Sequence, residues 1–268
     1  MHRSGTSALA GALRLVGADL GRNLMPATTF NPEGHFEHAE LVAHDERLRD
    51  ALGSRWDDLR PLPRRWWERR RVAGFDGERR ELLRREFGAS RLWAVKDPRM
   101  CRLLPGWTPA LHALGGDWHY VLIARDPREV ARSLAARDEF PAWKSHVLYL
   151  DHMLAAERST RDHTRAFLTY EERLEDGPAV LRRIGEELDL GWSARVTAET
   201  QLLHAFLRPR LRHHTAPGSA GRSRLERMAG EPTRRSRPQR RAARRSCRRR
   251  WTRSPSCSTT SSYPGRAA

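Results

Sequence analysis

Short apolar runs alternate with longer segments of helical period, and this alternation constrains the fold more than any other feature. Three runs have the length of a strand, at 92–95, 119–124 and 166–169. Helical segments separate them, so the strands are expected to be parallel and joined by crossovers. Parallel sheets need cover on both faces. The sequence therefore predicts an α/β fold, with a central parallel sheet flanked by helices.

The helical segments differ in how they should pack. The segment 142–159 carries Val147, Leu150 and Leu154 as an apolar stripe, which should face the core. The segment 66–87 alternates charges at helical spacing and is expected to be a solvent-exposed helix. Helices are predicted at 6–16, 38–52, 66–87, 103–114, 128–137, 142–159, 178–188 and 194–206.

A short turn rich in small and hydroxyl residues precedes the first helical segment, and it consists of Arg3, Ser4, Gly5, Thr6 and Ser7. Gly5 allows a tight turn, and Thr6 and Ser7 are good N-cap residue types. A helix N-terminus next to an arginine can bind an anion. An ordinary capped helix would have the same sequence, so both interpretations are open. The spacing G-x-x-x-x-G-K-[ST] of nucleotide triphosphatases is absent.

A second segment favours the anion-binding interpretation. The run 119–124 is followed by Arg125, Asp126 and Pro127, and then by a helical stretch that carries Ser133. Together the two segments resemble the PAPS-dependent sulfotransferases, in their bacterial branch; PAPS is 3′-phosphoadenylyl sulfate. Members carry a 5′-phosphosulfate loop near the N-terminus and a 3′-phosphate motif at a strand end. The resemblance extends to Asn31–Glu37, Lys96–Arg99 and Thr169–Glu171, and it covers roughly residues 1–214.

The resemblance implies a three-layer, P-loop-type α/β domain over residues 1–214 that transfers a sulfuryl group from PAPS to a hydroxyl or amine. Arg3, with the backbone of Ser4 to Ser7, would hold the 5′ end of PAPS and neutralise the charge on the bridging oxygen. Arg125 and Ser133 would hold the 3′-phosphate. An ion pair between Arg125 and Asp126 at the start of the helix is the alternative.

Sulfuryl transfer also benefits from a base that takes the proton of the acceptor. Glu37, Asp97 and His35 are the candidates, and we expect Glu37 because similar bacterial sulfotransferases have a glutamate at a comparable place. Lys96 could steady the transferring group or anchor Asp97. Tyr170 follows a strand and could stack on adenine, or it could be a core residue.

Positive charge is concentrated at the end of the chain. The net charge is +17, but residues 1–207 hold 32 basic and 31 acidic side chains, whereas 208–268 hold 18 arginines and two glutamates. Residues 215–268 are rich in Arg, Ser and Pro, and we expect a disordered tail or out-of-frame translation. A nucleic-acid binder acting through this tail is one rival function. A P-loop kinase using ATP is another, although it predicts a Gly-Lys-[Ser/Thr] loop and a metal-binding acid.

Several sequence signals are missing. No apolar run reaches the roughly 20 residues of a membrane span, and no signal peptide or group with metal-ligand spacing stands out. The three cysteines are scattered. We expect a cytoplasmic protein whose acceptor is a small molecule, a glycan or a lipid. No strand precedes the turn at Gly5, so we expect either that the start lies further upstream or that the chain is an inactive remnant.

Overall fold

Two strands form a parallel sheet at the centre of the described part of the chain. The structure is a computed structural model, and it describes residues 1–207. Strand β1 (Tyr120–Ala124) pairs with β2 (Arg165–Thr169), from Tyr120 opposite Arg165 to Ala124 opposite Thr169. Both strands lie where the apolar runs predict them. The predicted boundary at 214–215 and the basic tail lie outside the described residues.

The third predicted strand, at 92–95, is wrong. This segment makes one isolated parallel bridge, between Trp93 and Asp19. The amide of Asp19 donates to the Leu92 carbonyl at 3.0 Å, and the amide of Ala94 donates to the Asp19 carbonyl at 2.8 Å. The bridge does not extend because Asp19 lies between two turns, at Gly17 and Gly21, whose φ angles are +97° and +84°. The fold is therefore mixed α/β with a two-stranded parallel sheet among the described residues.

Each helix predicted from the sequence corresponds to one or more helices of the structure. The differences are in where the helices end and in two predicted helices that are divided. The segment 66–87 begins with two 3-10 helices, and 194–206 divides into two helices. The described residues contain α1 (Thr6–Leu15), α2 (Ala39–Ala51), η1 (Trp66–Glu68), η2 (Arg70–Val72), α3 (Ala73–Phe87), α4 (Met100–Leu114), α5 (Pro127–Asp138), α6 (Ala142–Thr160), α7 (Tyr170–Glu175), α8 (Gly177–Glu187), α9 (Ser193–Ala198) and α10 (Thr200–Phe206). None of these helices of residues 1–207 is both long enough and apolar enough to cross a bilayer.

Helix α7, directly after β2, was not predicted from the sequence. A reciprocal capping box starts it: the Glu172 amide donates to Thr169 Oγ1 at 3.1 Å, and the Thr169 amide donates to Glu172 Oε2 at 2.8 Å. The spacing Thr-x-x-Glu is a sequence signal for this motif. The box fixes where the chain turns after β2, and therefore where the next side chain, Tyr170, lies.

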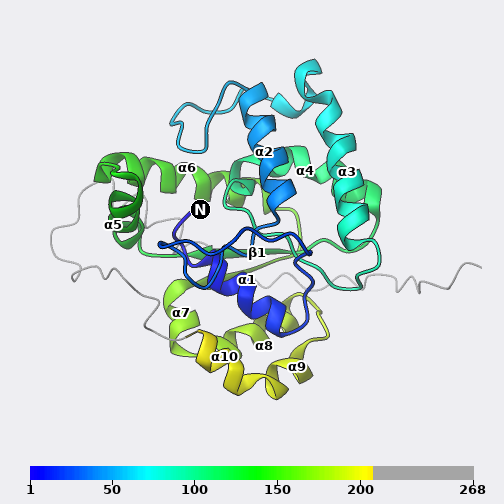
Figure 1. Ribbon diagram of the computed structural model, residues 1–268, viewed down its shortest axis with the longest axis vertical. Helices are drawn as coiled ribbons and strands as arrows, with labels where there is room; N and C mark the ends of the chain where they lie inside the picture. Colours follow the sequence, from blue (N-terminus) through cyan, green and yellow to red (C-terminus); the bar gives the residue numbers. More distant parts are fainter. Residues whose placement is uncertain (208–268) are drawn as a thin grey trace, which may run out of the picture. The chain divides into compact units, whose positions relative to one another are not determined.

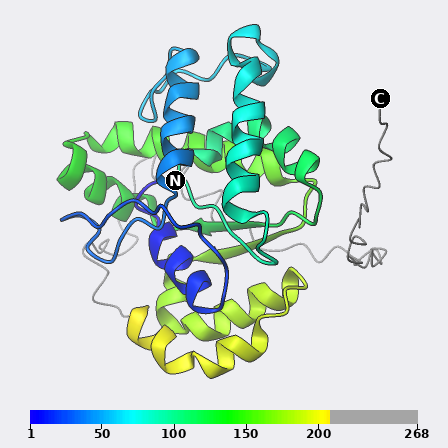
Figure 2. The same ribbon diagram turned by 45° about the vertical axis from the view of Figure 1, so that its right-hand side comes forward.

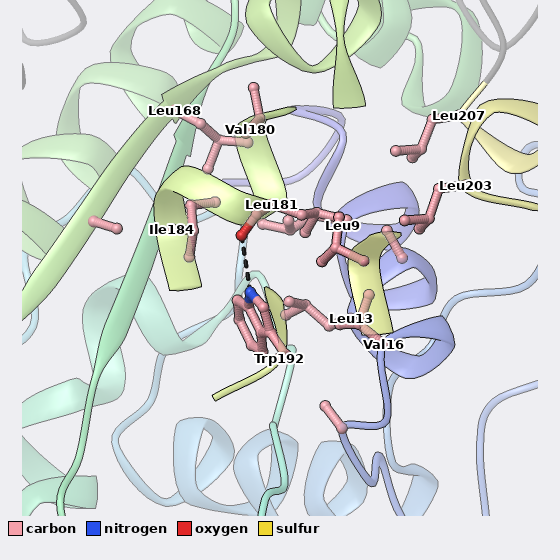
Figure 3. Packing of buried hydrophobic residues seen from close by; sticks show 14 of the residues in the cluster. Leu9, Leu13, Val16, Leu168, Val180, Leu181, Ile184, Trp192, Leu203 and Leu207 are labelled. Atoms are coloured by element: carbon pink, nitrogen blue, oxygen red, sulfur yellow. Dashed lines mark hydrogen bonds between the residues drawn. The ribbon is translucent and has the colours of Figure 1, made fainter. Parts of the chain in front are cut away.

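Helices lie on both sides of the sheet. Helices α1, α8 and α10 lie on one side, and α4 and α6 lie on the other (Figures 1 and 2). On the first side, a buried apolar cluster joins α1 to β2 and α8–α10 (Figure 3). Within it, the indole nitrogen of Trp192 donates to the Leu181 carbonyl at 2.8 Å. This cluster fixes α1, and with it the turn before α1, against the sheet.

Two packing predictions need correction. In α6 the buried face carries Leu148, Tyr149 and Met153, whereas Leu154 of the predicted stripe is 37% exposed. In α3 one face is not exposed to solvent, because Leu83 and Phe87 are buried against the cluster that includes α2 and α4. The charge pattern of α3 describes only its outer face.

The cluster around α1 predicts how strongly α10 contributes to stability. Leu203 is fully buried in this cluster, whereas the neighbouring Leu202 is 56% exposed. We expect Leu203→Ala to lower the free energy of unfolding by about 2–5 kcal/mol, because it removes buried methyl groups and leaves a cavity. Leu202→Ala is the matched control and should change it by less than about 0.5 kcal/mol. Urea unfolding of both variants measures the difference, and equal losses would contradict the packing.

Candidate functional site

The carboxyl ends of the two strands place two side chains next to each other. Because Ala124 pairs with Thr169, the residues that follow them, Arg125 and Tyr170, leave the sheet at the same edge. The guanidinium carbon of Arg125 lies 4.1 Å from the centroid of the Tyr170 ring. Ligands of α/β folds bind outside the carboxyl ends of the strands, so a ligand site is expected at this edge.

The turn before α1 packs against this same edge. Gly5 has φ +86°, and a Cβ built on it would lie 2.6 Å from Cδ2 of Tyr170, so only glycine fits there. Arg125 Nη1 donates a hydrogen bond of 3.0 Å to the carbonyl oxygen of Arg3. The structure thus brings together the two segments that the sequence analysis singled out, although about 120 residues separate them.

The predicted capping role of the hydroxyl residues is wrong. Gly5 is the N-cap of α1, and no side chain caps this helix. Ser7 Oγ instead accepts hydrogen bonds from Asn31 Nδ2 and from Lys96 Nζ, both at 3.1 Å. Because no side chain caps α1, the amides of its first turn are left for a ligand or water to satisfy.

Arg3 links the two predicted anion sites rather than serving only one of them. Its Nε donates to Ser133 Oγ at 2.6 Å, and its Nη1 donates to the Phe30 carbonyl at 2.9 Å. Burial, together with the nearby charges of Arg137 and Arg125, lowers the pKa of Arg3 to about 10. The side chain therefore remains a cation at neutral pH.

Arg125 is buried and held from two sides. Its Nε and Nη2 each lie 3.0 Å from Glu129 Oε2, one turn along α5. Asp126, the alternative partner, accepts from the Arg128 amide at the start of α5 and pairs with the Arg128 side chain at 2.7 Å. Arg125 is thus held in place by Glu129 and by its bond to the N-terminal turn.

Glu37 lies at the centre of a second charged group, which Lys96 ties to Ser7. Its Oε1 accepts a hydrogen bond of 2.5 Å from Lys96 Nζ, and its Oε2 lies 3.1 Å from Arg99 Nη1. Lys96 also donates to the His35 carbonyl at 3.1 Å. Burial lowers the pKa of Lys96, and the opposite charge of Glu37 works against this effect. Lys96 therefore connects Glu37 to Ser7 in α1.

Asp97 differs from Glu37 in its access to ligand. Asp97 Oδ1 accepts from the Arg99 amide at 2.8 Å and from Arg99 Nη1 at 2.9 Å. Burial raises its pKa to about 6, although Arg99 opposes this. Glu37 and His35 line the pocket described below, whereas Asp97 does not. Of the three candidate bases, only Asp97 is absent from the pocket lining.

A pocket opens between these groups and holds most of the predicted site residues. It encloses about 830 Å³ of non-atom space, a figure that includes open solvent at its mouth. Five arginine or lysine side chains and only two glutamates line it, so its charge favours an anionic ligand. The lining includes Arg3, Gly5, Thr6, Ser7, Glu33, His35, Glu37, Lys96, Arg125, Arg137, Tyr170 and Arg173.

The structure also shows pocket residues that the sequence reading did not single out. Asn31, named above only as the start of the segment Asn31–Glu37, ties this segment to α1 through Ser7, and Arg137 and Arg173 add charge to the wall. The Thr-x-x-Glu capping box could have placed Arg173 on the same helix as Tyr170. Tyr170 itself is 2% exposed and in contact with two guanidinium groups, so its stacking on adenine stays a prediction.

One group of potential metal ligands lies elsewhere in the described chain, where the sequence spacing gave no sign of it. Ligand atoms of His38, Glu40 and Glu86 lie within 4.8 Å of one another. Arg85 pairs with both glutamates, at 2.6 Å from Glu40 and 3.4 Å from Glu86. The two carboxylates thus have a cation already, and these residues do not line the pocket.

The contact between Gly5 and Tyr170 can be tested with a matched glycine. Gly5 and Gly53 both have positive φ, but a Cβ at Gly53 meets nothing within 4 Å. We expect Gly53→Ala to lower the free energy of unfolding by about 1–2 kcal/mol from backbone strain alone. Gly5→Ala adds a clash with the Tyr170 ring and should cost about 1–3 kcal/mol more. Denaturant unfolding of both variants decides, and equal losses would show that Tyr170 does not press on the turn.

Comparisons with known proteins assign no family to this chain. No family model matches it, and it matches neither a curated protein nor a solved structure. The chemistry of the site therefore has to be argued from the residues of this chain and their geometry.

Proposed function

We propose that this chain is a PAPS-dependent sulfotransferase with a three-layer, P-loop-type α/β domain. The observation that carries the proposal is the hydrogen bond between Arg125 Nη1 and the Arg3 carbonyl, 3.0 Å long. It joins the strand-end arginine to the N-terminal turn beside a basic pocket. A nucleotide with anionic groups at both ends needs such a pair of neighbouring anion sites.

The charges of the pocket support an anionic ligand. Among residues 1–207, no carboxylate forms an ion pair with Arg3 or with Arg173, although both line the pocket, Arg173 buried and Arg3 partly buried. A buried charge without a counterion is costly. A ligand that brings phosphate or sulfate groups into the pocket would supply the missing negative charge.

The proposed roles use residues that line the pocket, together with Ser4 and Ser133, which are buried outside its lining, Ser133 bonded to Arg3. Arg125 and Ser133 would hold the 3′-phosphate, and the amides of Ser4 to Ser7 would hold the 5′ end of PAPS. Arg3 belongs to the N-terminal turn and donates a hydrogen bond to Ser133. Its side chain would therefore lie between the 5′ end and the 3′-phosphate of PAPS. PAPS, when bound, supplies an activated sulfuryl group.

Glu37 is the proposed base for the proton of the acceptor. Its carboxylate is buried and lines the pocket, and Lys96 and Arg99 hold both of its oxygens in place. Such fixed positioning of charges is the main source of catalysis in group transfer. Lys96 would position Glu37 and place a positive charge beside the transferring group.

Binding of adenosine 3′,5′-bisphosphate, the desulfated product, tests the nucleotide assignment by calorimetry. We expect the wild-type chain to bind it more tightly than ATP with Mg²⁺. Arg125→Ala should weaken binding by about 1.5–3 kcal/mol, because a charged hydrogen bond is lost. Arg132→Ala is the control: Arg132 is exposed on the same helix and does not line the pocket. Preference for ATP with Mg²⁺ would favour the kinase alternative, and an unchanged affinity in Arg125→Ala would refute the assigned role.

Transfer of labelled sulfate from PAPS to a panel of hydroxyl and amine compounds tests the role of Glu37. Glu37→Gln keeps the shape of the side chain but removes the base, so turnover should fall by roughly 10²–10⁴-fold. Affinity for the bisphosphate should change by less than about threefold, because only the proton transfer is affected. Glu33→Gln is the control, since Glu33 lines the pocket but is exposed. Equal turnover in the two variants would exclude Glu37 as the base.

A further inference from the structure

Arg173 is buried and lacks hydrogen-bond partners among the described residues, and the proposed function gives it no specific role. It is 2% exposed, and none of its three guanidinium nitrogens has a hydrogen-bond partner among the described residues. Buried arginines in folded proteins are almost always hydrogen-bonded, because an unpaired buried donor costs roughly 1–3 kcal/mol or more. An exception in the wall of a pocket calls for a ligand.

The position of Arg173 points to the anionic group that would complete it. Its guanidinium carbon lies 4.6 Å from the centroid of the Tyr170 ring, and that of Arg125 lies 4.1 Å from the same centroid. Both arginines line the pocket, at the edge where β1 and β2 end. Burial, and then the charge of Arg125, lowers the pKa of Arg173, which fits two cations that share one small region. The Tyr170 ring, which both guanidinium groups contact, offsets part of this positive charge but supplies no hydrogen-bond acceptor for the guanidinium nitrogens of Arg173.

We propose that Arg173 binds a doubly charged phosphate-type group together with Arg125, and that in the nucleotide this group is the 3′-phosphate. The identity of the nucleotide rests on the proposed function, whereas the oxyanion site itself rests on the buried, unpaired guanidinium. A guanidinium presents its donors in a planar fork that matches two oxygens of a phosphate. Arg125 already bonds Glu129 and the Arg3 carbonyl. Arg173 would add a second guanidinium group to the oxyanion site.

The site makes a prediction that separates ligand binding from a structural role. A structural arginine stabilises the ligand-free protein, whereas a buried charge that waits for a ligand destabilises it. Arg173→Met removes the charge and keeps most of the side-chain volume. We expect the ligand-free variant to unfold at a temperature equal to or higher than the wild type. A clear decrease in its unfolding temperature would show that Arg173 is structural and would overturn the proposal.

Calorimetry of the full chain measures the binding itself with three probes. Adenosine 3′,5′-bisphosphate should bind Arg173→Met about 10–150-fold more weakly than wild type, the equivalent of one lost charged hydrogen bond. Adenosine 5′-phosphate lacks the 3′ group and should bind both chains within about threefold. Inorganic phosphate should bind wild type more tightly than Arg173→Met, by about tenfold or more. Arg182→Met is the matched control, since Arg182 lies on α8 outside the pocket lining and the variant loses the same charge.

The outcomes distinguish this proposal from the proposed function. If wild type binds the bisphosphate and Arg173→Met binds it equally well, the role of Arg173 is refuted and the sulfotransferase proposal stands. If wild type binds inorganic phosphate through Arg173 but not the bisphosphate, the oxyanion site stands and the nucleotide assignment is refuted. If Arg173→Met weakens the binding of adenosine 3′,5′-bisphosphate and of adenosine 5′-phosphate equally, Arg173 does not bind the 3′-phosphate, and that assignment is overturned. If Arg182→Met loses as much affinity as Arg173→Met, the loss comes from the change in net charge, and the proposed oxyanion site at Arg173 is overturned.

Discussion

The close packing of the N-terminal turn against Tyr170 is the contact on which the candidate site depends. Gly5 adopts a left-handed conformation, and the absence of a Cβ lets the backbone lie directly on the aromatic ring. The hydrogen bond from Arg125 to the Arg3 carbonyl fixes the same turn from the neighbouring strand end. A turn at residue 5 is thereby fixed to side chains at 125 and 170.

Two charged groups contribute side chains to the pocket and differ in how their charges are balanced. In one group, Lys96 and Arg99 neutralise Glu37, which suits a carboxylate that must be held in one place. In the other group, Arg125 has Glu129, but Arg3 and Arg173 have no carboxylate in an ion pair within residues 1–207. The pocket is thus balanced where chemistry is proposed and positive where the anions of a ligand are proposed to bind.

The sequence predicted local structure better than tertiary detail. The strands predicted at 119–124 and 166–169 and the helix predicted at 128–137 lie within one residue of β1, β2 and α5, because apolar runs and turn residues are local signals. The strand at 92–95 failed because a strand needs a partner, and the segment around Asp19 is too short to provide one. The structure brings several of the predicted site residues together, since Glu37, Lys96 and Arg125 line one pocket with the N-terminal turn. The bond of Arg3 to Ser133 and the isolation of Arg173 depend on side-chain directions, which no spacing in the sequence specifies.

The buried charge of Arg173 has a consequence for how this chain can change over generations. A residue that destabilises the empty protein persists only while its ligand, or selection for that ligand, holds it there. In a lineage that no longer used the pocket, replacing Arg173 by an apolar side chain would not destabilise the protein, whereas replacing Leu203 or Gly5 would. The identity of residue 173 among descendants of this gene would therefore record whether the pocket is still in use.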